Sequence, residues 1–201
     1  AITDTRDGPA RIHEVYGDLC VVIPYLMPGF GLAQFCAREF AKQRRDHTIG
    51  MVLLKHGIFS FGDSARESYE RMIDLVSRAE DYLREHKAWK ISLPADTPAS
   101  TEPVAQAALR RSISDAAGGP MVLKTCASER GLGFARHAEV ARISQQGPAT
   151  PDHVIRTKRV PMLGADVGRY VEAYGRYFAE QAASAREPKT MLDPAPRVVL
   201  D

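Results

Sequence analysis

The sequence contains few of the features that mark specialised classes of protein. Its 201 residues include only three cysteines, Cys20, Cys36 and Cys126, and no CxxC pair. A zinc ribbon, a redox pair or a disulfide scaffold is therefore not indicated, and we expect buried free thiols in a reducing compartment. No apolar run approaches the roughly 18 residues of a membrane span, and no apolar segment near the N-terminus is typical of a secretory signal. We therefore expect a cytoplasmic protein without membrane contact.

The chain also lacks an excess of either charge. Lysine and arginine number 27 and aspartate and glutamate 25, a formal net charge of +2. This balance gives no reason to expect a nucleic acid or an anionic membrane as partner. Hydrophobic residues make up 44% of the chain, as is ordinary for a globular protein. The length predicts one domain or a tight pair.

The first half of the chain alternates strand and helix patterns. An apolar β-branched run predicts a strand over 19–25, and helical spacing of apolar residues follows over 31–43. A continuous apolar run over 51–54 is typical of a strand covered on both faces, and a second short strand over 58–61 follows a bend at His56-Gly57. Ser64 and Glu67 fit a capping box for a helix over 64–88. Its expected apolar stripe comprises Ala65, Tyr69, Met72, Ile73, Val76, Ala79 and Leu83.

A proline-rich segment over 92–104 is the predicted linker between two parts, 1–91 and 105–201. In the second part we expect helices over 105–117 and 166–186, and a helical stretch over 128–145 interrupted at Gly131 and Gly133. Strands are predicted over 121–125, 153–160 and 197–200. Strands alternating with helices indicate an α/β fold in both parts.

His56 is the most informative single residue. It ends an apolar strand and precedes a glycine, so the chain can turn and leave the imidazole at a sheet edge, where α/β proteins place ligands. A neutral imidazole there could bind zinc. The plain alternative is a histidine that caps the strand through a hydrogen bond. The neighbouring Lys55 invites a Schiff-base interpretation, but we expect it to face solvent.

Arg156 and Lys158 are candidate substrate-binding residues. In a strand over 153–160 they would lie on one face, with Arg159 opposite. Two cations on one face could hold a phosphate or a carboxylate. The alternative is an edge strand protected by charge.

Beyond these patterns, the segment GMVLLKHGIFSFGDSARESYERMIDLVSRAEDYL resembles class II aldolase/adducin domains. In that family an apolar strand runs into His-Gly, and a short strand and a long helix follow. The similarity extends back over GDLCVVIPYLMPGFGLAQFCAREF. The blocks TPDHVIRTKRVPMLG and KTMLDPAPRVVLD resemble a narrower group, the bifunctional rhamnulose-phosphate aldolase/short-chain alcohol dehydrogenase proteins. The resemblance implies a partial three-layer αβα aldolase-like sheet, the C-terminal half of that domain, followed by a smaller α/β connecting subdomain.

The resemblance also implies a chemistry. His56 would be the third ligand of a zinc ion that acts as a Lewis acid on an enediolate, while a carboxylate moves the proton. The family takes its other ligands from a His-x-His pair, which this chain does not contain. We therefore expect an incomplete zinc site and an inactive isolated chain that is an excerpt of a longer homo-oligomeric enzyme. Its substrate would be a rhamnulose-type ketose phosphate, and NAD would bind only to a downstream dehydrogenase module.

Two other functions stay open on the sequence. A non-catalytic, adducin-like assembly module would keep the fold without the zinc ligands. A sugar-acid decarboxylase or epimerase could use the same scaffold, because fold does not fix function.

Overall fold

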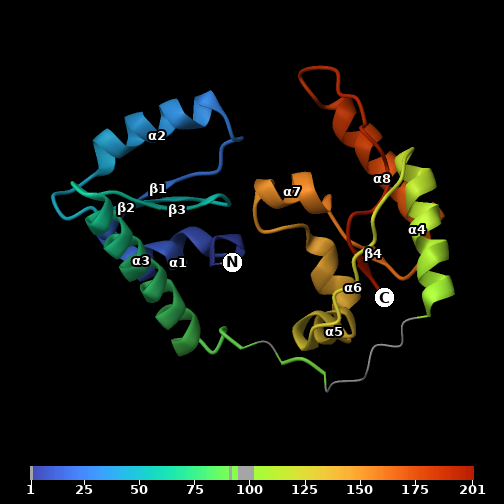
Figure 1. Cartoon of the computed structure of the whole chain (residues 1–201). Helices are drawn as coiled ribbons and strands as arrows, with labels where there is room; N and C mark the ends of the chain where they lie inside the picture. Colours follow the sequence, from blue (N-terminus) through green and yellow to red (C-terminus); the bar gives the residue numbers. More distant parts are fainter. Residues whose placement is uncertain (1, 91, 95–101) are drawn as a thin grey trace. The chain divides into compact units, whose positions relative to one another are not determined.

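The computed structural model describes residues 2–90, 92–94 and 102–201. Its internal contacts divide the chain into two units (Figure 1), which we describe separately: residues 1–91 with 149–153, and residues 92–148 with 154–201. The central part of the predicted linker, residues 95–101, lies outside the described residues. Within the described ranges, no helix is long and apolar enough to cross a membrane.

The first unit is a three-layer arrangement of helices around a small sheet. Its elements are η1 Ile2–Asp4, α1 Gly8–Tyr16, η2 Gly17–Leu19, β1 Cys20–Ile23, α2 Phe30–Gln43, β2 Gly50–Leu53, β3 Gly57–Ser60 and α3 Ala65–Glu85. The strand order is β1-β2-β3, with β1 parallel to β2 and β3 antiparallel to it. The predicted strands, the bend between β2 and β3, and the two helices are confirmed.

Alternation along the strands decides which helix covers which face. Cys20 and Val52 pack with α1 and α3 in a core that also holds Leu75 and Tyr82. Their neighbours Val21, Ile23 and Leu53 pack with Leu32 of α2 on the opposite face. Figure 1 shows α2 on one side of the sheet and α1 with α3 on the other. This is the αβα layering that the family resemblance implies.

Helix α3 begins as predicted and buries a different face. The Ser64 hydroxyl accepts a hydrogen bond from the Glu67 N–H at 3.1 Å, and the ion pairs Glu67–Arg71, Asp74–Arg78 and Glu80–Arg84 form. The expected apolar stripe is wrong in part: Tyr69, Ile73 and Val76 are exposed, whereas Leu75 is fully buried. The sheet contacts the face centred on Leu75, because the helix is rotated relative to the stripe that spacing alone selects.

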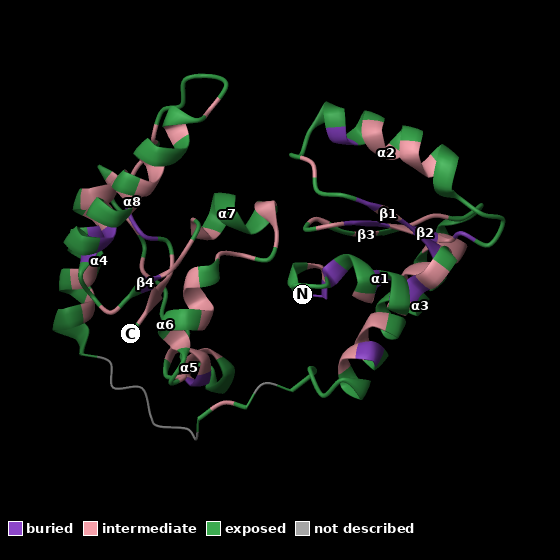
Figure 2. Ribbon diagram, turned by 180° about the vertical axis from the view of Figure 1, so that it is seen from behind, coloured by how far each residue is buried: buried purple, intermediate pink, exposed green. Residues whose placement is uncertain are grey.

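The second unit is mainly helical. Its elements are α4 Pro103–Ala117, α5 Glu129–Ala135, α6 Val140–Ile143, η3 Ser144–Gln146, α7 Pro151–Thr157 (whose first residues group with the first unit), β4 Met162–Leu163, α8 Val167–Ala183 and β5 Val199–Leu200. β4 and β5 form a two-stranded parallel sheet. Ile113 of α4, Met162 of β4, and Val167 and Tyr170 of α8 share one core. Figure 2 colours the described residues by their burial.

Two strand predictions in this unit are wrong. Residues 121–125 form no strand, because side chains of α4 bind the backbone there: Met121 N–H donates to Ser114 Oγ and its carbonyl accepts from Arg110 Nε. Residues 151–157 form helix α7 rather than a strand, since Pro151 at the first turn is pre-organised for a helix. Gly131 and Gly133 lie inside α5, so the helical stretch breaks after Ala135 instead. The strand predicted over 197–200 is confirmed only for Val199–Leu200.

Candidate functional site

His56 lies in the turn that joins β2 to β3. Its N–H donates to the carbonyl of Leu53, the last residue of β2, at 3.0 Å. Lys55 adopts a left-handed φ of 66° and Gly57 a φ of 157°, so the chain reverses within a few residues. β1 and β2 are parallel and end at the same edge of the sheet. The turn therefore holds His56 at the C-terminal edge of the parallel pair, where α/β sheets present ligand-binding groups.

The His56 side chain is held by the segment that follows β1. Its Nε2 lies 2.8 Å from the carbonyl oxygen of Leu26, and its ring stacks on Tyr25 with centroids 5.4 Å apart. A carbonyl oxygen only accepts, so Nε2 carries the proton in this bond. In the neutral ring the lone pair then resides on Nδ1. Metal-binding histidines are commonly oriented in this way by a backbone carbonyl.

The described residues do not by themselves fit a zinc ion. Zinc takes three protein ligands and a water at catalytic sites, or four protein ligands at structural ones. Within residues 2–90, 92–94 and 102–201, no three His, Cys, Asp or Glu side chains come together to hold a metal. His56 offers one donor atom. Its role as a zinc ligand stays a prediction, and no chemical step through zinc follows from these residues.

Lys55, beside His56, is half exposed and lies 3.7 Å from Asp4 in an ion pair. A Schiff-base lysine needs a desolvated or cationic setting that lowers its pKa. An exposed lysine paired with a carboxylate has the opposite surroundings. The structure thus agrees with the expectation that Lys55 faces solvent.

The shared face predicted for Arg156 and Lys158 is wrong. Arg156 lies in the last turn of α7 and is exposed. Lys158 follows the helix with a left-handed φ of 62°, which turns the chain out of the helix. Strand alternation therefore does not apply to these two residues, and their substrate-binding role stays a prediction.

Lys158 is instead largely enclosed in a polar and aromatic cluster. Its ammonium lies 3.5 Å from Asp193 Oδ1 and also donates to the Asp193 carbonyl. It sits 4.2 Å from the centroid of the Tyr174 ring, and Arg197 forms a second ion pair with Asp193. Burial lowers the pKa of Lys158, and the Asp193 charge offsets this only in part.

For Asp193, the pairing interactions have a larger effect on the pKa than burial does. Burial alone would raise its pKa, but hydrogen bonds from Arg197 and from the Ala195 N–H, with the Lys158 charge, outweigh it and lower the pKa. Sequence reasoning missed this group. The available signal was the Asp-Pro-Ala-Pro-Arg run at 193–197, which places an acid and a base four residues apart in a proline-stiffened segment.

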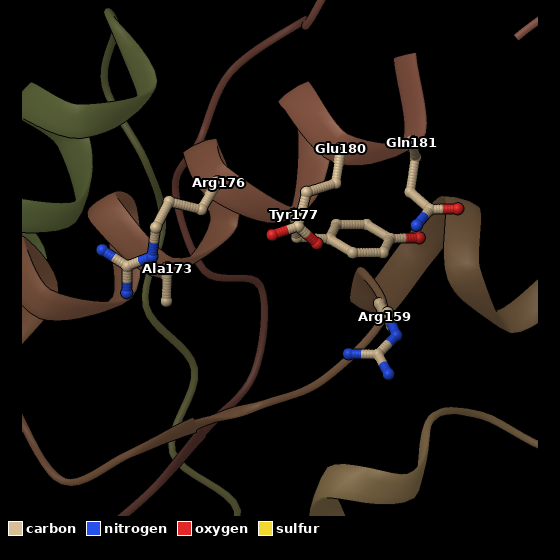
Figure 3. A pocket seen from close by; sticks show the side chains of 6 residues that line it. All are labelled: Arg159, Ala173, Arg176, Tyr177, Glu180 and Gln181. Carbon is tan, nitrogen blue, oxygen red and sulfur yellow. The ribbon is translucent and has the colours of Figure 1, made fainter. Parts of the chain in front are cut away.

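A depression lies beside this cluster, on α8. Its lining residues are Arg159, Ala173, Arg176, Tyr177, Glu180 and Gln181, and its volume is about 560 Å³. Figure 3 shows Arg159 entering from a different segment than the other labelled side chains, which belong to α8. The Arg159 guanidinium lies 5.1 Å from the centre of the Tyr177 ring.

Family models match both parts of the chain. The second-domain model, "Aldolase class II, second domain", matches residues 100–201, which is half of the chain. The model "Class II Aldolase and Adducin N-terminal domain" matches residues 7–83. The chain therefore belongs to the class II aldolase family.

Two individual proteins are similar to the chain. The "Uncharacterized oxidoreductase YuxG" of Bacillus subtilis (strain 168) is 24% identical over 219 residues, which cover 96% of this chain and 31% of that protein. The chain thus spans about a third of the length of this curated relative. The solved "N-terminal Class II Aldolase domain of a conserved protein from Thermoplasma acidophilum" is 41% identical, with a TM-score of 0.35, over 41% of this chain and 37% of that one.

Proposed function

We propose that this chain is part of a sugar-catabolic enzyme that joins an aldolase-type lyase to an oxidoreductase. The lyase would cleave a rhamnulose-type ketose phosphate with the help of zinc, and a short-chain dehydrogenase module would oxidise the aldehyde product. The observation that carries the proposal is the ordered match of two class II aldolase models to one chain. The name of the longer Bacillus subtilis relative supports the oxidoreductase part.

The residue proposed to act in the lyase is His56. The Leu26 carbonyl accepts a hydrogen bond from Nε2, which leaves the lone pair of the neutral ring on Nδ1. Through this lone pair Nδ1 can bind a cation or accept a proton from a substrate. Any metal would need further ligands from residues outside the described ranges or from a second copy of the protein. The proposal therefore concerns the complete gene product.

The test measures zinc by elemental analysis in the complete gene product and in the 201-residue chain. We expect about one zinc per protein in the former and far less in the latter, because one histidine does not make a site. His56→Ala should remove the metal from the complete product. His47→Ala, which changes an exposed histidine in the same unit, should leave it bound.

The second readout is the retro-aldol cleavage of rhamnulose 1-phosphate, which is measured through the release of the triose phosphate. Cleavage that is lost in His56→Ala and kept in His47→Ala supports the proposal. The proposal is contradicted if the zinc content of the complete product does not change in His56→Ala, or if the complete product cleaves no ketose phosphate.

The second candidate is an assembly module without catalysis. The observation that favours it is the lack, within the described ranges, of a group of three metal-binding side chains. A complete gene product that contains neither zinc nor lyase activity, but forms a defined oligomer by light scattering, would support this alternative.

A further inference from the structure

The depression on α8 is lined by more cationic than anionic side chains. Lys158 and Arg197 are both paired with Asp193. In the described part of the chain, Arg159 and Arg176 form no ion pair, although Glu180 lines the same depression. Two guanidinium groups beside one carboxylate leave a net positive charge. Such a surface attracts an anion.

Arg159 is also pre-positioned. The left-handed turn at Lys158 sends the lysine into the core and leaves Arg159 against the face of Tyr177, 5.1 Å from the ring centre. A guanidinium held over a ring by cation–π attraction keeps its N–H groups available as hydrogen-bond donors. Planar, bidentate donation is the way in which arginine binds phosphate and carboxylate groups. Tyr177 thus supports the arginine without using its donors.

The other lining groups suit hydroxyls. Glu180 accepts hydrogen bonds, and Gln181 both donates and accepts them. Figure 3 shows both side chains near Tyr177. The volume of about 560 Å³ lies within the range of small-molecule sites. The depression offers little apolar surface to an apolar ligand, because its lining contains one alanine and otherwise polar or aromatic side chains.

We propose that this depression binds a small polyhydroxylated molecule through its phosphate or carboxylate group, with Arg159 as the principal anion-binding residue. The site lies wholly in the second unit, and no residue of the His56 turn contributes to it. It does not depend on the proposed aldol chemistry, and its binding is expected without any metal.

The test titrates the 201-residue chain, in the presence of a chelator, with four probes: glucose 6-phosphate, gluconate, inorganic phosphate and glucose. Isothermal calorimetry gives the affinity, and NMR shifts of the Gln181 side-chain amide report the location. We expect one of the two hydroxylated anions to bind more tightly than inorganic phosphate, and glucose not to bind. Which of the two binds better identifies the anionic group.

Variants localise the site. Arg159→Gln should weaken binding by about tenfold, as expected for a lost charge-assisted pair, and Tyr177→Leu should weaken it more than Tyr177→Phe, which keeps the ring. Arg169→Gln, an exposed arginine of α8 outside the depression, removes the same charge and should leave the affinity within about twofold of the original. Circular dichroism confirms that each variant is folded.

Three results would overturn the proposal. Equal losses in Arg159→Gln and Arg169→Gln would show a general charge effect. Binding of glucose as tightly as of glucose 6-phosphate would exclude anion recognition. Failure of all four probes to bind would show that the depression is not a site for this class. None of these results bears on zinc or on aldol cleavage.

Discussion

Lys158 and Asp193 lie 35 residues apart in the sequence and meet in the second unit, with 3.5 Å between Nζ and Oδ1. The two side chains are only 11% and 15% exposed. Their pairing ties the segment before β5 to the end of α7, and Tyr174 covers the ammonium. Lys158, which strand alternation predicted to lie on a substrate-binding face, therefore has a structural partner in Asp193.

Asp193→Asn should destabilise the protein by about 2 kcal/mol, because Lys158 and Arg197 would lose their shared counter-charge and its hydrogen bonds in a partly buried site. Urea unfolding followed by near-UV circular dichroism measures the change. Glu187→Gln is the matched control, since that glutamate is 81% exposed and should change stability by less than about 0.5 kcal/mol. Equal effects of the two variants would show that the Lys158–Asp193 pair contributes no more to stability than an exposed carboxylate does.

The same pair predicts a pH dependence. The pKa of Asp193 is lower in the folded protein than in the unfolded chain, so its stabilising effect is complete above the unfolded value of about 4 and is lost as the pH falls below it. Unfolding midpoints measured from pH 6 downward should therefore fall less steeply in Asp193→Asn than in the original chain. Parallel slopes below about pH 4 would contradict this assignment.

Leu75 and Gly50 should be intolerant of substitution. Leu75→Ala empties a fully buried site and should cost about 3 kcal/mol. A Cβ on Gly50 would lie 2.6 Å from Leu75 Cδ1 and 2.8 Å from the Phe59 carbonyl, so Gly50→Ala should also destabilise.

Two controls match these variants. Leu192→Ala alters a side chain that is 97% exposed. Gly31→Ala places a methyl where nothing lies within 4 Å in helix α2 and should stabilise by roughly 0.5 kcal/mol. Fluorescence of Trp89, the sole tryptophan, follows urea unfolding of the first unit. A Gly50→Ala variant as stable as Gly31→Ala would mean that the sheet and α3 are not packed as described.

Ser64→Ala should cost about 1 kcal/mol through the loss of the α3 N-cap. The hydroxyl accepts from Glu67 N–H, and the Glu67 carboxylate accepts from Asp63 N–H at 2.7 Å. Ser77→Ala, at an exposed position within α3, controls for the change of residue type and should be neutral or slightly stabilising, since alanine favours helices. Thermal unfolding of the two variants makes the comparison, and equal midpoints would argue against the cap.

The three thiols should differ in reactivity. Burial raises the pKa of Cys20 to about 12, whereas a hydrogen bond from Ser128 lowers the pKa of Cys126. Titration with a disulfide reagent at pH 8 should modify Cys126 first and Cys20 only after unfolding, because the thiolate is the reactive form. The expectation of buried thiols is confirmed for Cys20 and is wrong for Cys126, which is exposed, while Cys36 is only half-buried. A Cys126→Ser variant that still shows the fast phase would contradict the assignment.

Local sequence patterns were reliable where one physical effect dominated. Apolar runs predicted β1 and β2, and the Ser64–Glu67 box predicted the start of α3. They failed at 121–125 and 153–160, where runs of strand-forming residues have no strand partner. At 121–125 the side chains of Ser114 and Arg110 bind the backbone instead.

The sequence by itself determined the α/β class, through its alternating strand and helix patterns, and the family, through ordered motifs along the chain. It also determined the position of His56 after an apolar strand, because that depends only on neighbouring residues. Only the tertiary structure decided which face of α3 is buried, that Leu26 orients the His56 ring, and that Lys158 turns inward while Arg159 stacks on Tyr177. Those outcomes depend on contacts between residues far apart in the chain. The free energy of such contacts comes from burial and pairing, which local spacing does not encode.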